Sequence, residues 1–362
     1  MILYIEKQAK DYKQTNHIIS KFKNADIVWI DNYKNIFDKK MWDFSVEKSI
    51  IVAKLTSAVI TDAPKNYGHN NETSYFFKTS LNCVYNCSYC FLKWAFKNDM
   101  QVYFVNYEEI KQEIVEKIRW ISSSWKGEVP QRGDGGDYEL KIKSDYNNAL
   151  WFYSSDYSDI LWMDYLSGFM QEFVPFFEEQ AGTMMEVRTK SANIKPILDL
   201  WFVPKNTEFS FSLNPSELIK KYESWTSSLD ERIESINVLL RKWYKVWLRF
   251  LPLLPVKNYR ETYREFVQEV AEKIDMSKIS SSFASGLLYT KKDYNVMLKK
   301  YPKLDVLYRL QEEKNNPDWF IRENREIRDY FYNLFRKLDE KCFICLDEPS
   351  SNLSQGERNN KN

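Results

Sequence analysis

Short apolar runs alternate with amphipathic stretches along most of the chain. Three runs near the start, at residues 2–5, 27–30 and 50–52, predict strands of a small α/β lead-in. Six further runs predict strands at residues 74–79, 149–153, 184–189, 208–213, 246–251 and 279–288. Stretches with helical spacing, such as residues 166–178 and 229–242, separate most of them. This alternation predicts parallel strands joined by crossover helices.

The six later strands predict an α/β fold with a partial (β/α)6 TIM-like barrel. In such barrels the chemistry lies at the carboxyl ends of the strands. A turn-rich stretch at residues 62–71 precedes the first barrel strand, and a polar stretch ends the chain. We therefore expect an N-terminal α/β lead-in over residues 1–70, the barrel over 71–340 and a C-terminal tail over 341–362.

The overall charge gives no general reason to expect a nucleic acid or membrane partner. The 362 residues include 52 Lys and Arg against 51 Asp and Glu. Two segments are locally basic and contain aromatic residues, 232–263 and 291–303, which suits a nucleic-acid backbone but equally suits a solvated helix face. No signal sequence or membrane-length apolar run is evident, so we expect a cytoplasmic protein without membrane contact.

The five cysteines form two groups, and the first predicts a metal centre. Cys83, Cys87 and Cys90 follow a predicted strand with C-x3-C-x2-C spacing. Structural zinc usually takes four ligands, whereas a [4Fe-4S] cluster with three thiolates keeps one iron open for a substrate or cofactor. Cys342 and Cys345 form the second group, either as further ligands, as a late hydrogen-atom donor, or as free or buried thiols.

The first group, with Tyr89 directly before its last cysteine, resembles the signature of the radical S-adenosylmethionine superfamily. The resemblance implies that Cys83, Cys87 and Cys90 hold a [4Fe-4S] cluster and that S-adenosyl-L-methionine binds its open iron. It also implies an electron donor, a reductase or a flavodoxin or ferredoxin, and a 5′-deoxyadenosyl radical as the reactive species. A zinc-stabilised nucleic-acid-binding protein is the non-enzymatic alternative.

Several short segments resemble the spore photoproduct lyase family over residues 1–340. They include CSYCFL at 87–92, VRTK at 187–190, FSFSLN at 209–214 and LDERIES at 229–235. The resemblance implies that Ser158, Lys190 and Ser212 contact S-adenosylmethionine, and that the substrate is a nucleic acid or nucleotide. An ammonium suits the cofactor's carboxylate. The alternatives are a solvated lysine at a strand end and serine hydroxyls bonded to backbone.

The chain departs from that family at two positions. Asp156 stands where the family has a cysteine that returns a hydrogen atom to the substrate radical, and Phe91 replaces a tyrosine after the last cluster cysteine. A carboxyl group is a poor hydrogen-atom donor, so we expect a different substrate or a different fate of the substrate radical. A peptide or small metabolite is the alternative substrate class.

The catalytic candidates are Tyr89, Asp156 and Tyr157. Asp156 and Asp159 follow the second barrel strand, where a carboxylate suits proton transfer to or from a polar substrate. An aspartate at this place is also a common N-cap of the next helix, and the sequence leaves both roles open.

Overall fold

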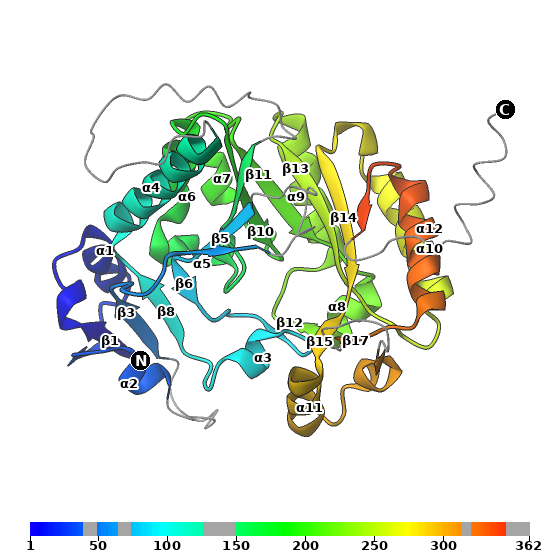
Figure 1. Cartoon of the computed structure of the whole chain (residues 1–362), viewed down its shortest axis with the longest axis horizontal. Helices are drawn as coiled ribbons and strands as arrows, with labels where there is room; N and C mark the ends of the chain where they lie inside the picture. Colours follow the sequence, from blue (N-terminus) through cyan, green and yellow to red (C-terminus); the bar gives the residue numbers. More distant parts are fainter. Residues whose placement is uncertain (39–48, 64–73, 126–148, 313–319, 345–362) are drawn as a thin grey trace.

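The computed structural model describes residues 1–38, 49–63, 74–125, 149–312 and 320–344 (Figure 1). An eight-stranded sheet forms the centre of the molecule and curls into a half-barrel, with the order β18-β14-β13-β11-β10-β9-β5-β4. Its six central strands are those expected from the sequence: β5 (Ser74–Phe77), β9 (Leu150–Tyr153), β10 (Thr183–Thr189), β11 (Thr207–Ser212), β13 (Val246–Leu253) and β14 (Ser281–Gly286). They pair in parallel throughout, which confirms the predicted α/β partial barrel.

Two short strands extend the sheet beyond the prediction. β4 (Ile60–Asp62) pairs antiparallel with β5, and β18 (Phe343–Ile344) pairs in parallel with β14. Strands of two or three residues are too short to produce a recognisable apolar pattern.

The barrel strands are buried on both faces, as parallel strands usually are. All six residues of β11 are buried. The face toward the helices is apolar, whereas the inner face carries polar groups among its aromatic side chains. Arg249 of β13 and Glu186 of β10 form a bidentate ion pair there, at 2.9 and 2.8 Å, and neither side chain is more than 1% exposed.

Most crossover helices lie against the outer face of the half-barrel (Figure 1). The longer ones are α4 (Tyr107–Trp125), α5 (Ile160–Ser167), α6 (Phe169–Glu178), α9 (Leu229–Arg241), α10 (Tyr259–Lys273) and α12 (Arg325–Leu338). A capping box formed by Ser228 and Glu231 begins α9. Within the described residues, no helix has the length and apolar character needed to cross a bilayer.

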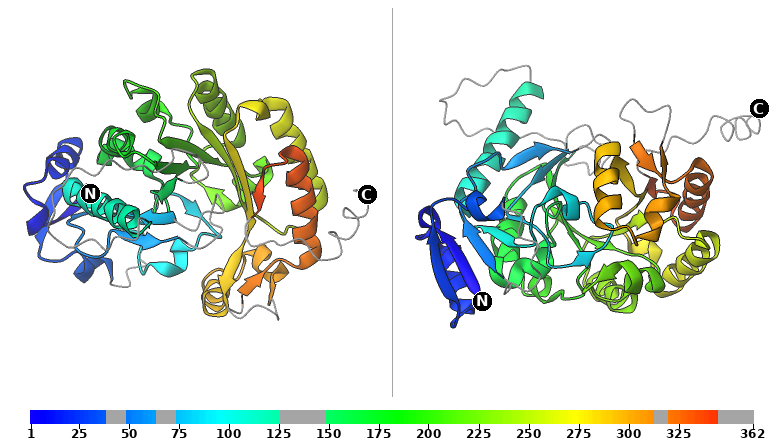
Figure 2. Two further views of the ribbon diagram at one scale, coloured as in Figure 1. Left: turned by 45° about the horizontal axis from the view of Figure 1, so that its top comes forward. Right: turned by 90° about the horizontal axis from the view of Figure 1, so that it is seen from below.

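A second sheet contains the three expected N-terminal strands and stands beside the half-barrel (Figure 2). These strands are β1 (Ile2–Glu6), β2 (Asp26–Ile30) and β3 (Ile50–Ala53). Two strands from beyond residue 70 complete the sheet: β8 (Gln101–Phe104) pairs in parallel with β3, and β6 (Ser80–Leu81) pairs antiparallel with β8. After β5 the chain therefore leaves the barrel sheet and enters the second sheet at β6. The cysteine loop then connects β6 to β8 of the same sheet.

A small module follows β14 and lies next to the cysteine loop (Figure 1). It contains a three-stranded antiparallel sheet of β15 (Leu288–Thr290), β17 (Phe320–Arg322) and β16 (Gln311–Glu312), together with α11 (Lys291–Lys300). The helix α11 contacts α3 (Leu92–Ala95), which begins just after the last cysteine of the triad.

Candidate cluster and cofactor site

The three cysteines lie in one loop at the carboxyl end of the barrel strands. Cys87 belongs to β7 (Asn86–Cys87), which pairs antiparallel with β12 (Glu223–Ser224). The backbone amide of Ser88 donates to the carbonyl of Tyr222 at 2.8 Å. From the small module, the hydroxyl of Tyr289 donates to the carbonyl of Tyr89 at 2.9 Å. The loop is thus fixed from two sides.

The three thiols suit an iron–sulfur cluster better than a site for a single metal ion. Burial raises the pKa of the Cys83 thiol to about 12 and that of Cys87 well above its ordinary value, and the thiols raise one another's pKa further. Such thiols need a bound cation to become thiolates. Among the described residues, no three His, Cys, Asp or Glu side chains are arranged around a single metal ion. Three soft sulfur donors on one loop instead suit a cluster with several irons.

The predicted cofactor residues lie at the ends of neighbouring strands, on the same side as this loop. Lys190 directly follows β10, and its Nζ lies 3.5 Å from Oε1 of Glu223. The hydroxyl of Ser158 is 2.6 Å from that of Ser80, which precedes the cysteines. Ser212 ends β11, is buried, and accepts a hydrogen bond at its carbonyl from Arg232 at 2.7 Å. The fold brings Ser158, Lys190 and Ser212 to one end of the barrel.

Asp156 lies at the same end, close to the triad. Its carboxylate is 3.8 Å from the guanidinium of Arg188, and the two side chains are only 17% and 12% exposed. Burial raises the pKa of Asp156, although Arg188 opposes the increase. Burial also raises the pKa of the Cys90 thiol, and the nearby Asp156 adds to it. Asp156 is therefore a carboxylate near Cys90 whose ion pair with Arg188 is long.

The aromatic rings of Phe91 and Tyr157 meet beside Asp156. Their centroids are 6.5 Å apart in an edge-to-face arrangement. Phe91 is the residue after Cys90, and Tyr157 is the residue after Asp156. The two positions expected from the sequence to depart from the family pattern, Phe91 and Asp156, thus lie near each other in the fold.

Tyr89 and Asp159 have partners that the sequence did not specify. The hydroxyl of Tyr89 donates to the buried carboxylate of Glu223 at 2.5 Å. Asp159 is the N-cap of α5 and accepts hydrogen bonds from the backbone amides of Trp162 and Lys190 at 3.0 and 2.8 Å. The N-cap role considered for Asp159 is therefore confirmed.

Cys342 lies at the opposite end of the barrel. It is fully buried just before β18, and the following residue, Phe343, pairs with Phe283 near the start of β14. Burial raises the pKa of its thiol to about 12. Cys345 lies outside the described residues. Cys342 is thus remote from the mouth where a hydrogen-atom donor would act.

Sequence reasoning missed the polar group behind the cysteine loop. Glu223 is 2% exposed and accepts hydrogen bonds from Tyr89, Arg232 and Asn214. Burial raises the pKa of the Glu223 carboxyl, but the positive charges of Lys190 and Arg232 outweigh burial and lower this pKa to about 2. Asn214 and Arg232 lie within the quoted motifs at 209–214 and 229–235, but Glu223 has no local motif that could have identified it.

Only part of the predicted basic surface is exposed. Arg232 and Arg249 are fully buried in ion pairs, and Tyr244 and Trp247 belong to the core. Exposed residues of the segment 232–263 include Arg241, Lys242, Trp243, Lys257 and Arg260. Most lysines of α11 are exposed as well.

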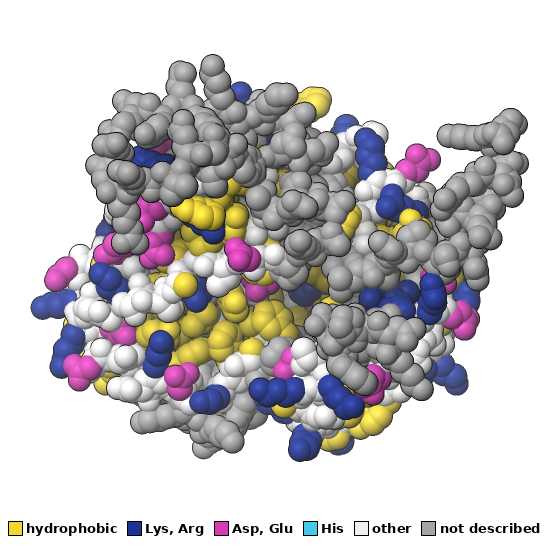
Figure 3. Space-filling model, viewed as in Figure 1, with side chains coloured by type: hydrophobic (Ala, Val, Ile, Leu, Met, Phe, Trp, Pro, Cys, Tyr) yellow, Lys and Arg dark blue, Asp and Glu magenta, His cyan; other side chains and the backbone are white. Residues whose placement is uncertain are grey.

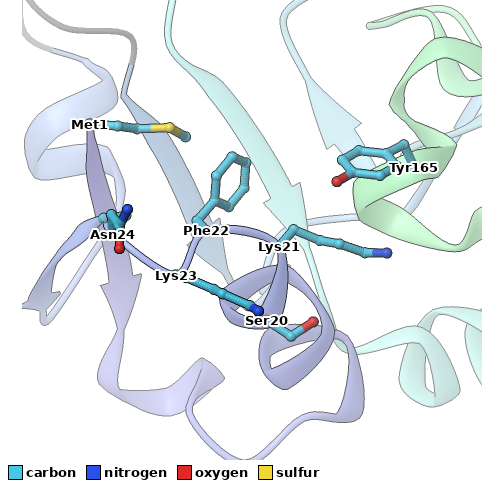
Figure 4. A pocket seen from close by; sticks show the side chains of 8 residues that line it. Met1, Ser20, Lys21, Phe22, Lys23, Asn24 and Tyr165 are labelled. Atoms are coloured by element: carbon cyan, nitrogen blue, oxygen red, sulfur yellow. The ribbon is translucent and has the colours of Figure 1, made fainter.

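A separate hollow lies between α1 (Lys13–Lys21) with its following turn and α5, far from these residues (Figure 4). Lys21 lies over the ring of Tyr165 there, with Nζ 4.8 Å from the centroid. Its lining includes none of the predicted site residues.

The comparisons with known proteins identify the family. The family model described as spore photoproduct lyase matches residues 140–336. The chain belongs to the spore photoproduct lyase family. It is 24% identical over 333 residues to the lyase of Bacillus subtilis (strain 168), covering 88% of this chain and 86% of the relative. It is 28% identical over 167 residues to the lyase of Clostridium acetobutylicum, covering 46% and 48% of the two chains.

Solved structures of spore photoproduct lyase share the fold. One is complexed with dinucleoside spore photoproduct and aligns with a TM-score of 0.73 at 18% identity, covering 95% of this chain and 97% of the other. A double mutant with bound AdoMet and dinucleoside spore photoproduct aligns with a TM-score of 0.72 over the same shares. The chain is thus a spore photoproduct lyase-like radical S-adenosylmethionine enzyme with that family's partial barrel.

Proposed function

We propose that Cys83, Cys87 and Cys90 hold a [4Fe-4S] cluster and that the enzyme abstracts a hydrogen atom from a photoproduct in nucleic acid. The observation that carries the proposal is the placement of this fixed, three-thiol loop at the end of the barrel where Ser158, Lys190 and Ser212 also converge. When bound, the cluster and S-adenosylmethionine supply a 5′-deoxyadenosyl radical. A reductase, flavodoxin or ferredoxin would provide the electron.

The chain's own residues bind and orient the cofactor. The ammonium of Lys190 offers a charge-assisted hydrogen bond to the cofactor's carboxylate. Its distance of 3.5 Å from both Glu223 and the carbonyl of Leu251 shows that its present hydrogen bonds are long, so a closer partner would be favourable. The hydroxyls of Ser158 and Ser212 would bind the polar atoms of the same cofactor.

Exposed lysines beside the cysteine loop support a nucleic-acid substrate. Lys97 and the half-buried Lys93 are in or near α3, and the exposed Lys292, Lys299 and Lys303 are in or near α11. No carboxylate in the described part of the chain pairs with these five side chains. Lysine and arginine side chains gather on this face where α11 lies (Figure 3). An uncompensated cluster of lysines binds phosphates without reading the sequence.

The fate of the substrate radical differs from that in a lyase that uses a thiol donor. From its segment in the sequence, we expect Asp156 to stand at the position of the family's thiol. Cys342 lies at the other end of the barrel. The carboxylate of Asp156 serves instead to hydrogen-bond or move a proton at the substrate. We therefore expect that the enzyme does not convert spore photoproduct to two thymines at a useful rate.

Anaerobic reconstitution with iron and sulfide tests the proposal. We expect about four irons per chain with acid-labile sulfide, and formation of 5′-deoxyadenosine from S-adenosylmethionine under reducing conditions. A spore-photoproduct dinucleotide should be consumed without stoichiometric formation of the repaired dinucleotide with two thymine residues. Efficient multiple-turnover formation of that repaired dinucleotide would show that the proposed fate is wrong. Stoichiometric zinc without iron would contradict the radical enzyme itself.

A further inference from the structure

One buried carboxylate connects the cysteine loop to the predicted cofactor lysine. The side chain of Glu223 is 1% exposed and has four donors around it. Tyr89 of the loop lies at 2.5 Å, Arg232 of α9 at 2.7 Å, Asn214 after β11 at 3.0 Å, and Lys190 after β10 at 3.5 Å. These four donors come from segments up to 143 positions apart, since the first is residue 89 and the last is residue 232.

The backbone of the same residue fixes the position of Cys87. Glu223 is directly opposite Cys87 in the two-residue ladder of β12 and β7. The preceding residue, Tyr222, accepts the amide hydrogen bond of Ser88. The backbone of Glu223 therefore pairs with Cys87, and its side chain accepts a hydrogen bond from Tyr89, two residues further along the same loop.

The two cations near Glu223 differ in how firmly they are held. Arg232 also donates to the carbonyls of Ser227 and Ser212 at 2.9 and 2.7 Å and to the hydroxyl of Thr226 at 2.7 Å, so its guanidinium is fixed. Lys190 has only the long contact to Glu223, a 3.5 Å contact to the carbonyl of Leu251 and a position 5.9 Å from the ring centre of Tyr89. Among the described residues, Glu223 is thus the only carboxylate that forms an ion pair with Lys190.

We infer that Glu223 is a positioning residue that holds the Lys190 ammonium toward the cofactor's carboxylate and fixes the Cys87 half of the cluster loop. This inference rests on the proposed function. A neutral amide cannot replace the carboxylate, because all four neighbours are donors and the amide NH₂ group would face them. Aspartate at position 223 would keep the negative charge, but its shorter side chain would lie farther from the four donors.

Binding of S-adenosylmethionine to the reconstituted enzyme tests the inference. We expect Glu223→Gln to raise the cofactor's Kd at least about tenfold and to alter the change that the cofactor causes in the electron paramagnetic resonance spectrum of the reduced cluster. Glu223→Asp should lie between Gln and the wild type. Glu6→Gln is the matched control, because Glu6 is also a buried carboxylate, 1% exposed, but accepts its bonds in the N-terminal sheet. It should leave Kd within about twofold of the wild type.

A double-mutant cycle shows whether Glu223 acts through Lys190. Lys190→Met should raise the Kd for S-adenosylmethionine at least about tenfold. Adding Glu223→Gln to Lys190→Met should raise that Kd by less than about threefold more. The inference would be overturned if the fold-change in Kd of the double variant equalled the product of the two single fold-changes. A folded Glu223→Gln variant with the Kd and spectrum of the wild type would also overturn it. If Glu223→Gln does not fold, Glu223→Asp replaces it in the cycle. A wild type that binds neither iron nor cofactor would instead contradict the proposed function.

Discussion

Asp159 ties two neighbouring strand ends together at the mouth of the barrel. It caps α5 by accepting from the amide of Trp162, and it also accepts from the amide of Lys190 and the hydroxyl of Thr189 at 2.8 Å each. The side chain thereby fixes the backbone of Lys190 while Glu223 contacts its ammonium. Both ends of this lysine are positioned by buried carboxylates.

Asp159→Ala should lower the free energy of unfolding by about 2 to 3 kcal/mol, because a cap is lost and buried donors lose their acceptor. Urea unfolding of the purified protein measures this. Asp275→Ala removes an exposed cap of a short helix and serves as the control. It should cost less than about 1 kcal/mol. Equal, small losses in both variants would show that Asp159 is not a structural link.

Lys300 is a half-buried lysine whose ammonium donates to the carbonyl of Lys93. Burial, together with the nearby charge of Lys93, lowers its pKa to about 8. Since this pKa lies below that of an unfolded lysine, the neutral amine is present at pH values above about 8. We expect amine-directed acylation of Lys300 to increase with pH around a midpoint of about 8.

Mass spectrometry of the labelled peptides provides the measurement, with the exposed Lys299 as the internal reference. The ratio of Lys300 to Lys299 labelling should be high and constant below about pH 8 and should fall at higher pH, because Lys300 is then already neutral while an ordinary exposed lysine is still losing its proton. A ratio that does not change with pH would contradict the expected environment of Lys300.

At the scale of elements, the barrel could be predicted from the sequence because its strands are buried on both faces. The run 208–213 is a clear example, since every residue of β11 is buried. The ladder of β7 and β12 could not be predicted, because each strand has two residues and the partners are more than 130 positions apart. The cysteine spacing identified the loop, but Glu223, which backs it, becomes a neighbour of Tyr89 only through folding.

The helix α11 offers a test of the nucleic-acid interface. Lys299→Ala together with Lys303→Ala should weaken binding of single-stranded DNA and reduce the slope of log K against log salt by about 1. Lys273→Ala with Lys278→Ala removes two lysines that already pair with carboxylates and should leave the slope unchanged. Filter binding over a range of salt concentrations provides both values. Equal slopes in the two double variants would place the nucleic acid elsewhere.

At the scale of the whole molecule, the cysteine loop lies where three parts of the chain meet. The half-barrel supplies Lys190 and Ser212, the N-terminal sheet contains β6 and β8 on either side of the loop, and the small module contacts the loop through Tyr289. With nearly equal numbers of basic and acidic residues overall, local charge at this junction decides which ligands bind.

The central claim is that the cysteine triad supports radical chemistry on S-adenosylmethionine. The most direct measurement is chromatographic detection of 5′-deoxyadenosine after anaerobic incubation of the reconstituted, reduced enzyme with S-adenosylmethionine, for the wild type and for Cys87→Ala. Cys342→Ala is the control, because this buried cysteine lies at the opposite end of the barrel. We predict that the wild type and Cys342→Ala form 5′-deoxyadenosine and that Cys87→Ala forms none. Undiminished formation of 5′-deoxyadenosine by Cys87→Ala, or none by the iron-loaded wild type, would contradict the account.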